Sequence, residues 1–194
     1  MVLTTDKQQL TGSFYLTETV TLASTLTDGQ RVQGSIDLGA YVDVASGQAV
    51  AIESVDFIYQ VGSDYGQAAT DMLGASGAIS VQLTDLNPNT AFLRADDHSL
   101  VASGSLNIDV TGSTATNGNK LYHQADLYPD NFGPTALSEA FMVVNDSLYL
   151  VAGPDSADIG TLDVYVTARI KCRIAKLSNK DFVAIAIQST ASDN

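Results

Sequence analysis

The chain has 194 residues, of which 45% are hydrophobic, and this length and composition fit one folded domain and exclude global disorder. The formal net charge is −13 and the pI is near 4.1, which exclude a generally basic, nucleic-acid-binding surface, so that any such contact must be local. Abundant Gly, Ser, Thr, Val and Asp, together with the absence of Trp, are typical of all-β proteins.

Segments of alternating apolar and polar residues follow one another along the chain, separated by turn residues. The predicted strands cover 13–23, 33–44, 49–61, 78–83, 91–95, 100–110, 120–128, 139–144, 147–151 and 162–176. Asp28-Gly29 and Asn145-Asp146 predict tight turns. The alternation changes phase near Glu53, which indicates a β-bulge or a bend. Without any strand-helix alternation, this spacing predicts an antiparallel β-sandwich or barrel.

The two ends of the chain differ from this pattern. Ser178 followed by Asp181 fits the start of a helix, with Ser178 as the N-cap. Val183, Ile185 and Ile187 nevertheless alternate with other residues as they would in a strand, so helix and strand both stay open and a short helix is preferred. We therefore expect a flexible N-terminal arm, a β-sandwich domain and a C-terminal segment with a frayed tail, at 1–12, 13–177 and 178–194.

The most regular strand, LDVYVTARIKCRIAK at 162–176, carries an unusual concentration of positive charge. Five of the nine Lys and Arg residues lie between 169 and 180, and all 22 acidic residues lie elsewhere. These five residues form a candidate basic patch: Arg169, Lys171, Arg173, Lys176 and Lys180. The first three are two residues apart, so their side chains share one face over about 13 Å.

Three explanations of this basic patch remain open. It is an ordinary solvated face, it faces the phosphates of an enclosed nucleic acid, or it faces acidic side chains. The acidic side chains would belong to the same subunit or to a neighbouring one, and those of Asp37 and Asp43 are candidates.

Catalytic motifs are absent from the sequence, which predicts that the protein is not an enzyme. His98 and His123 have no second His or Cys at ligand spacing, and neither a G-x-S-x-G motif nor a phosphate-binding loop occurs. Cys172 cannot form an internal disulfide and is interpreted as a small buried hydrophobic residue. The sequence shows no secretory signal and no membrane-spanning stretch, so we expect either a soluble product made inside the cell or one whose signal was removed before this numbering begins.

Two loops carry closely spaced oxygen ligands that would suit Ca²⁺. One loop has Asp126 and Asp130, and the other, the acidic segment at 153–160, has Asp155 and Asp158. These residues predict either calcium sites in loops or at subunit interfaces, or ordinary solvated acids. No other cofactor is expected.

Three stretches carry a resemblance to a known family. QGSIDLGAYVDV followed by AVAIESVDFIYQV is similar to a first pair of jelly-roll strands, NPNTAFLRADDHSL is similar to an inter-strand loop, and LDVYVTARIKCRIAKLS is similar to a long, cationic last strand. In these stretches the chain resembles the single jelly-roll capsid proteins of small icosahedral viruses, particularly those with circular single-stranded DNA genomes. The resemblance covers most of residues 13–177.

This resemblance implies an all-β fold, an antiparallel jelly-roll sandwich of about eight strands, and self-assembly into an icosahedral shell. The protein would then be found in the virion, with itself and a packaged nucleic acid as partners and no membrane. Residues 1–12 contain Lys7 as their one cation, whereas family members usually begin with a basic arm. Either this arm makes few contacts with the genome or another protein packs it. The alternatives are an extracellular carbohydrate- or calcium-binding module and a surface-layer or filament subunit.

Overall fold

The computed structural model describes residues 8–9, 12–63, 69–109, 121–128 and 140–190. These residues form β-strands, a short 3₁₀ turn and a C-terminal α-helix. The bounds are β1 Gln8–Gln9, β2 Phe14–Leu22, β3 Val32–Asp37, β4 Gln48–Val61, η1 Ala69–Asp71, β5 Gly77–Thr84, β6 Leu100–Asp109, β7 Leu121–Tyr128, β8 Phe141–Val143, β9 Ser147–Asp155, β10 Val164–Lys176 and α1 Asn179–Thr190.

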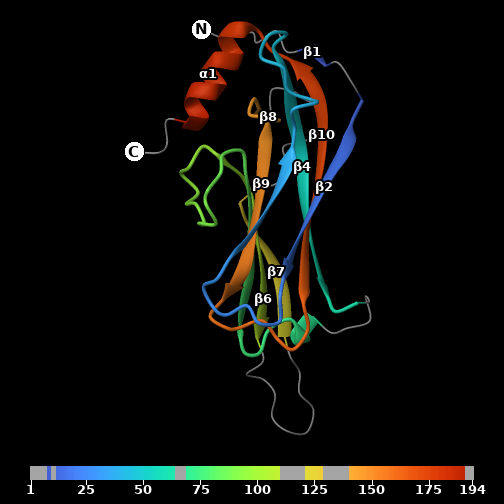
Figure 1. Cartoon of the computed structure of the whole chain (residues 1–194), viewed down its shortest axis with the longest axis vertical. Helices are drawn as coiled ribbons and strands as arrows, with labels where there is room; N and C mark the ends of the chain where they lie inside the picture. The colour runs from blue at the N-terminus through green and yellow to red at the C-terminus, as the bar shows by residue number, and fades with distance from the viewer. Residues whose placement is uncertain (1–7, 10–11, 64–68, 110–120, 129–139, 191–194) are drawn as a thin grey trace, which may run out of the picture.

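Two antiparallel sheets, each of five strands within the described residues, form a sandwich (Figure 1). The β10 sheet has the order β2-β10-β4-β8, and β1 pairs with the end of β10. The β9 sheet has the order β3-β9-β5-β6-β7. The chain crosses between the two sheets before and after each of β3, β4 and β9, whereas β5 and β6 follow one another in the same sheet. This connectivity is that of a jelly roll. The predicted jelly-roll β-sandwich is thus confirmed.

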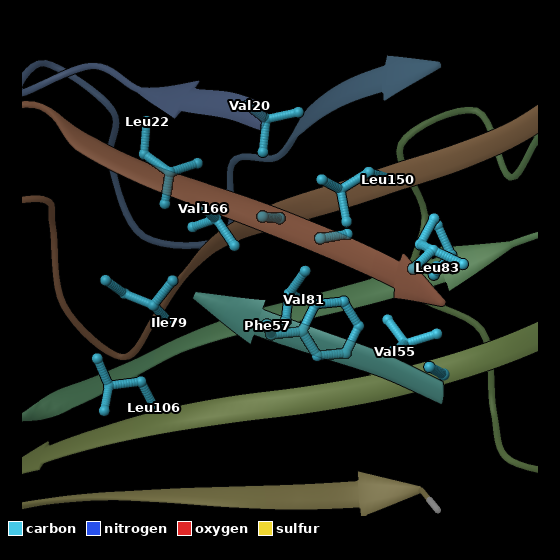
Figure 2. Close-up of a cluster of buried hydrophobic side chains, with 14 of the residues drawn as sticks. Val20, Leu22, Val55, Phe57, Ile79, Val81, Leu83, Leu106, Leu150 and Val166 are labelled. Atoms are coloured by element: carbon cyan, nitrogen blue, oxygen red, sulfur yellow. The ribbon is translucent and has the colours of Figure 1, made fainter. Parts of the chain in front are cut away.

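The core between the sheets is filled with aliphatic side chains from both of them (Figure 2). On β10, alternate residues are fully buried, namely Val164, Val166, Ala168, Ile170 and Cys172. They meet residues of the β9 sheet such as Ile79, Val81 and Leu150. Burial of apolar surface on this scale is the main force that holds the two sheets together.

The single cysteine lies in this core, as predicted. Burial raises the pKa of the Cys172 thiol to about 12, because the interior disfavours the charged thiolate. The thiol is therefore neutral near pH 7 and packs as a small hydrophobic group.

The predicted irregularity near Glu53 is a β-bulge. Lys171 of β10 lies opposite Ser54, but the next residue, Cys172, lies opposite Ile52, so Glu53 is the extra residue in β4. A bulge of this kind changes the phase of the alternation by one residue. Consequently Ile52 and Val55, which flank the bulge, both point into the core.

The predicted strand over 33–44 is wrong beyond Asp37, where β3 ends. The Asp37 carboxylate accepts the Gly39 N–H at 2.8 Å, and the Leu38 carbonyl accepts the N–H groups of Tyr41 and Val42. These local hydrogen bonds turn the backbone away from the sheet. The segment therefore continues as turns, and Asp43 shares no strand face with Asp37.

The predicted short strand at 91–95 is also absent from the described structure. Instead, the Gln82 side chain binds the backbone of Leu93 in both directions. Its amide nitrogen donates to the Leu93 carbonyl at 2.9 Å, and its amide oxygen accepts the Leu93 N–H at 2.7 Å. One side chain thus does the pairing that a neighbouring strand would do.

The C-terminal segment is a helix, α1, as preferred from its start signal. The Ser178 hydroxyl accepts the Asp181 N–H at 3.2 Å and donates to the Asp181 carboxylate at 2.8 Å, which forms an N-terminal cap. The helix packs beside the upper end of the β10 sheet in Figure 1. Phe182 joins a second apolar cluster there with Ala49, Ala51, Met142, Val144, Ala175 and Leu177. Within the described residues, no helix is long and apolar enough to span a bilayer.

Candidate functional site

Arg169 and Lys171 of β10 lie between β2 and β4, and Arg173 lies next to β4 just beyond the last residue of β10 that pairs with β2. Arg169, Lys171 and Arg173 alternate with core residues, so they point to the outer face of the sheet, away from the β9 sheet. The predicted common face of these three residues therefore exists. The charge and hydrogen-bond partners of these three residues come mainly from the neighbouring strands.

Lys171 and Arg173 both meet Glu53, the bulged residue of β4. Lys171 Nζ lies 3.2 Å from Glu53 Oε2, and Arg173 Nη2 forms an ion pair with Glu53 Oε1. The Ser13 hydroxyl donates a hydrogen bond to Oε2 at 2.9 Å. Glu53 is only 3% exposed, although it carries a charge. We call Glu53, Lys171, Arg173 and Ser13 the Glu53 network. Within one chain, the acidic partner of the basic strand is thus Glu53, and neither Asp37 nor Asp43 takes that place.

The other basic residues lie apart from this network. The Arg169 guanidinium stacks over the Tyr15 ring, 4.2 Å from its centroid, and Asp56 is its cross-strand neighbour on β4. Lys176 is exposed at the end of β10, three residues from Arg173 and so on the opposite side of the strand. Lys180 is exposed in the first turn of α1. The structure therefore brings Lys171 and Arg173 together at one acid and separates the remaining cations.

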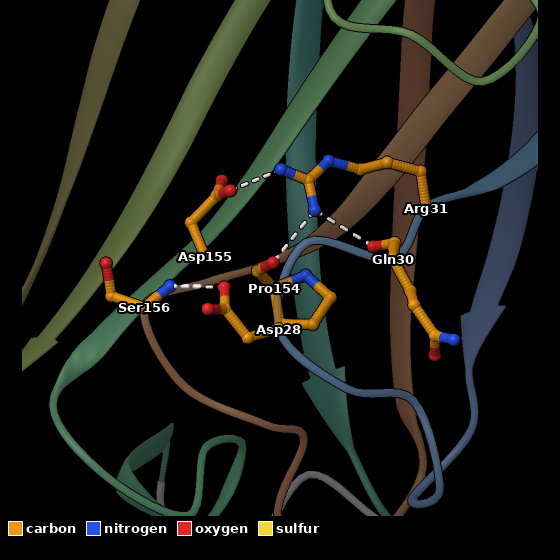
Figure 3. A network of polar contacts seen from close by, with 6 residues as sticks. All are labelled: Asp28, Gln30, Arg31, Pro154, Asp155 and Ser156. Atoms are coloured by element: carbon orange, nitrogen blue, oxygen red, sulfur yellow. Dashed lines mark hydrogen bonds and ion pairs between the residues drawn. The ribbon is translucent and has the colours of Figure 1, made fainter.

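Of the calcium candidates, Asp155 is the last residue of β9, whose arrow points to the lower end of the molecule in Figure 1, and Asp158 lies in the segment that follows. The Asp155 carboxylate forms an ion pair with Arg31, as Figure 3 shows. The Asp158 carboxylate accepts the Asp28 N–H at 2.8 Å. Asp126 lies on β7 opposite Gly104, and Asp130 lies outside the described residues.

Arg31 organises the loops at that end. Its guanidinium donates to the carbonyls of Gln30 and Pro154, at 2.9 and 2.8 Å, in addition to its ion pair with Asp155 (Figure 3). The Asp28 carboxylate accepts the Ser156 N–H at 2.7 Å. Asp155 and Asp158 thus tie the β2–β3 connection to the segment after β9. In the described ranges, no group of three or more His, Cys, Asp or Glu residues could hold a metal ion.

A second buried acid, Asp85, was not singled out from the sequence. It follows β5, is 1% exposed, and receives hydrogen bonds from the Asn145 side chain at its carbonyl (3.0 Å) and at its carboxylate (3.2 Å). Burial, and secondarily the nearby Asp97 charge, raise the pKa of Asp85 to about 7. A charged residue directly after an apolar strand was the available signal, but its burial depends on Asn145, which is 60 residues away.

The C-terminal helix also presents apolar side chains on the side that does not pack on the sheet. Val183 and Ile187 are 54% and 61% exposed. They are four residues apart on α1, so they lie next to each other on one helix face. Tyr15 and Ile58 add exposed apolar surface on the outer face of the β10 sheet.

Comparisons with known proteins give similarities among solved structures. No protein-family model matches the chain, and neither does any curated protein. Among solved structures, the chain is similar to a chain in the structure of Cocksfoot mottle virus, with 11% sequence identity, coverage of 87% of each chain and a TM-score of 0.28. A likeness at that TM-score carries no functional argument, so the functional conclusion has to come from the geometry described above.

Proposed function

We propose that the chain is a structural, non-catalytic subunit that assembles with copies of itself into a closed icosahedral shell around a nucleic acid, as a viral capsid protein. The observation that carries this proposal is the apolar surface on both sides of α1. Phe182 packs on the sandwich, whereas Val183 and Ile187 face outward. A helix that is apolar on two sides is stable when both sides are covered, and a second copy would cover the outer one.

The filled interior of the sandwich supports a role that depends on its outside. The side chains between the sheets are buried aliphatic groups from both layers, so the chain itself occupies the space where a barrel or sandwich can hold a ligand. Recognition therefore takes place on faces, ends and loops. Identical copies that meet through such surfaces close into a symmetric assembly when the rotation between them closes.

Charge sets a condition on this assembly. Copies with a net charge of −13 repel one another, and the repulsion is screened over about 8 Å at physiological ionic strength. We therefore expect assembly to strengthen as salt is raised, because the apolar contacts remain while the repulsion weakens.

Direct contact with a genome through the basic strand would involve few phosphates. Lys171 and Arg173 are already held at Glu53, and Arg169, Lys176 and Lys180 remain exposed. Each neutralised phosphate adds about 0.7 to the salt slope of single-strand binding. A slope of about 2 in oligonucleotide anisotropy titrations would fit contact by these three cations.

Mass photometry and negative-stain microscopy of the purified chain over a series of salt concentrations test the proposal. We expect closed particles of uniform diameter, and open filaments or sheets would instead favour a surface-layer or filament subunit. The variant Val183→Ser/Ile187→Ser should raise the concentration needed for assembly at least tenfold. Ile58→Ser is the matched control, because it removes an exposed isoleucine from the β10 sheet. A chain that stays monomeric at all concentrations and salt levels contradicts the proposal.

One observation favours a second candidate, a carbohydrate-binding module. Tyr15 is half exposed on the outer face of the β10 sheet beside Arg169, and an aromatic ring with nearby polar groups can hold a sugar ring. A glycan-array signal that disappears in Tyr15→Ala would support this alternative. The same array without any signal, together with closed particles, would exclude it.

A further inference from the structure

A cavity of about 600 Å³ lies between α1, β8 and the connection from β5 to β6. That connection is the green loop beside α1 in Figure 1. An adjoining cavity of about 510 Å³ shares Asp96, Asp97, His98 and Gln188 with it. The two cavities together form a recess on the outside of the sandwich.

Asp85 lies in the wall of the larger cavity and has an incomplete set of hydrogen bonds. Its N–H donates to the Ser99 carbonyl at 3.0 Å, and Asn145 donates to its carbonyl and to its carboxylate oxygen Oδ2. The other oxygen, Oδ1, is buried and has no hydrogen-bond partner in the part of the chain that the structure describes. A buried carboxylate oxygen without a donor is costly, and a donor from outside the chain would offset that cost.

The charged side chains in the wall of the larger cavity are acidic, and Arg94 lies in the wall of the adjoining cavity. The β5–β6 connection contributes Asp96, Asp97 and His98 to the cavity wall, whereas β8 and α1 contribute uncharged side chains. The Asp97 carboxylate already accepts two hydrogen bonds within the chain, from the backbone N–H and the hydroxyl group of Ser99. The larger cavity therefore contains three acids, and its described lining residues include no Lys or Arg.

The opposite wall is apolar. Leu100 from β6, Phe141 and Met142 from β8 and Ile185 from α1 line it. A wall of this kind favours an alkyl chain over a hydrated ion. The described residues also contain no group of three or more acidic, His or Cys ligands that could hold a metal ion.

We propose that this cavity binds a primary ammonium or guanidinium group carried on an aliphatic stem. The cationic head group donates hydrogen bonds to the acids around Asp85, and the stem packs against Met142 and Ile185. A free alkylamine or diamine has this chemistry, and so does a Lys or Arg side chain of another chain. The site is independent of the proposed shell, because one folded chain contains all of it.

Binding of the cation is linked to the proton on Asp85. Because the pKa of this carboxyl is raised to about 7, a cation that needs the carboxylate must displace a proton below that pH. Affinity should rise about tenfold per pH unit up to about pH 7 and then level off. Asp96, Asp97 and His98 also line this cavity, and Arg94 lines the adjoining one.

Isothermal titration calorimetry with n-butylammonium chloride, at constant ionic strength and pH 8, tests the proposal. We expect saturable binding that is at least tenfold tighter than that of tetramethylammonium, which has no N–H donor. Asp85→Asn should weaken it at least tenfold. Asp96 is exposed, so Asp96→Asn should fold normally even if Asp85→Asn does not. This second variant should weaken the binding of n-butylammonium several-fold. Asp56→Asn removes one acid from the outer sheet face and should leave the affinity unchanged.

Equal affinity for the two cations, unchanged affinity in Asp85→Asn and Asp96→Asn, or the absence of saturable binding would overturn the proposal. Mass photometry of the assembled chain with saturating n-butylammonium then distinguishes the two sources. Release of subunits identifies the natural occupant as a side chain of another copy. Intact assemblies with the amine bound identify a free amine.

Discussion

Two acids in this molecule are equally buried but have opposite surroundings. Glu53 is 3% exposed and meets Lys171, Arg173 and the Ser13 hydroxyl. Asp85 is 1% exposed and has an amide donor and a neighbouring acid in place of a cation. Burial alone therefore does not determine what a carboxyl group does in this fold.

The difference comes from where the two acids lie in the jelly roll. Glu53 is inserted in the middle of a sheet, directly beside the cationic strand, so that neighbouring strands supply its partners. Asp85 lies at the end of a strand, where a loop rich in acids folds back over it. The first position fixes a charge as part of the structure, and the second leaves a carboxyl that titrates near neutral pH.

The largest effect should come from Glu53→Gln, which leaves two cations without their acid. Breaking a buried ion pair from one side costs about 4 kcal/mol of the free energy of unfolding, because the remaining charge keeps its desolvation cost. Urea denaturation at pH 7 measures it. The control Asp56→Asn, on the same strand but exposed, should change stability by less than about 0.5 kcal/mol. A Glu53→Gln protein as stable as this control would show that the network contributes nothing.

Asp85→Asn should have an effect of the opposite sign, and only at a pH where the Asp85 carboxyl is ionised. The pKa of Asp85 is about 7 in the folded chain and 3.8 in its ordinary state, so the protonated carboxyl favours folding below about pH 4. This contribution is lost as pH rises to about 7, by about 4 kcal/mol. The variant should therefore gain stability over the parent progressively between pH 4 and 7. If the difference between the urea midpoints of the two proteins is the same at pH 4.5 and at pH 8, the raised pKa of Asp85 is contradicted.

Asn145→Ala should destabilise the chain by about 2 kcal/mol at pH 8, because two hydrogen bonds to Asp85 are lost. Since the Asn145 hydrogen bond lowers the pKa of Asp85, its removal should also move the titration of Asp85 to higher pH. Stability curves over pH measure both effects. In an Asp85→Asn background the pH shift should disappear, and a shift that persists there would have another origin.

The smallest effect should be that of Ser13→Ala. It removes one hydrogen bond to the Glu53 carboxylate and leaves both cations in place, so we expect a loss of about 1 kcal/mol. Ser24→Ala changes another exposed serine and should be neutral. Thermal or urea unfolding of the two variants side by side would show whether the hydroxyl contributes to the Glu53 network.

Much of the fold could be predicted from local patterns. The alternation of 162–176 predicted β10, the change of phase near Glu53 predicted the bulge, and the Ser178 signal predicted the start of α1. These features depend on residues that are neighbours in sequence. The failures at 38–44 and 91–95 arose where single side chains, Asp37 and Gln82, replaced strand pairing by hydrogen bonds of their own.

The charge partners could not be predicted in the same way. The sequence indicated that the basic strand needs acids, but only the order β2-β10-β4 places Glu53 beside Lys171 and Arg173. Asp37 was an equally acidic candidate until the structure placed it on β3, in the other sheet. Pairings between strands far apart in sequence follow from topology, which the local pattern does not contain.

The buried thiol of Cys172 has a practical consequence for work on this protein. Because its pKa is raised to about 12, almost no thiolate is present near pH 7 to react with maleimides or iodoacetamides. A cysteine introduced at an exposed position, such as Ala184 on α1, would then be the main reactive site. Fluorophores or spin labels could be attached there in the otherwise natural chain, and distances between neighbouring copies could be measured directly.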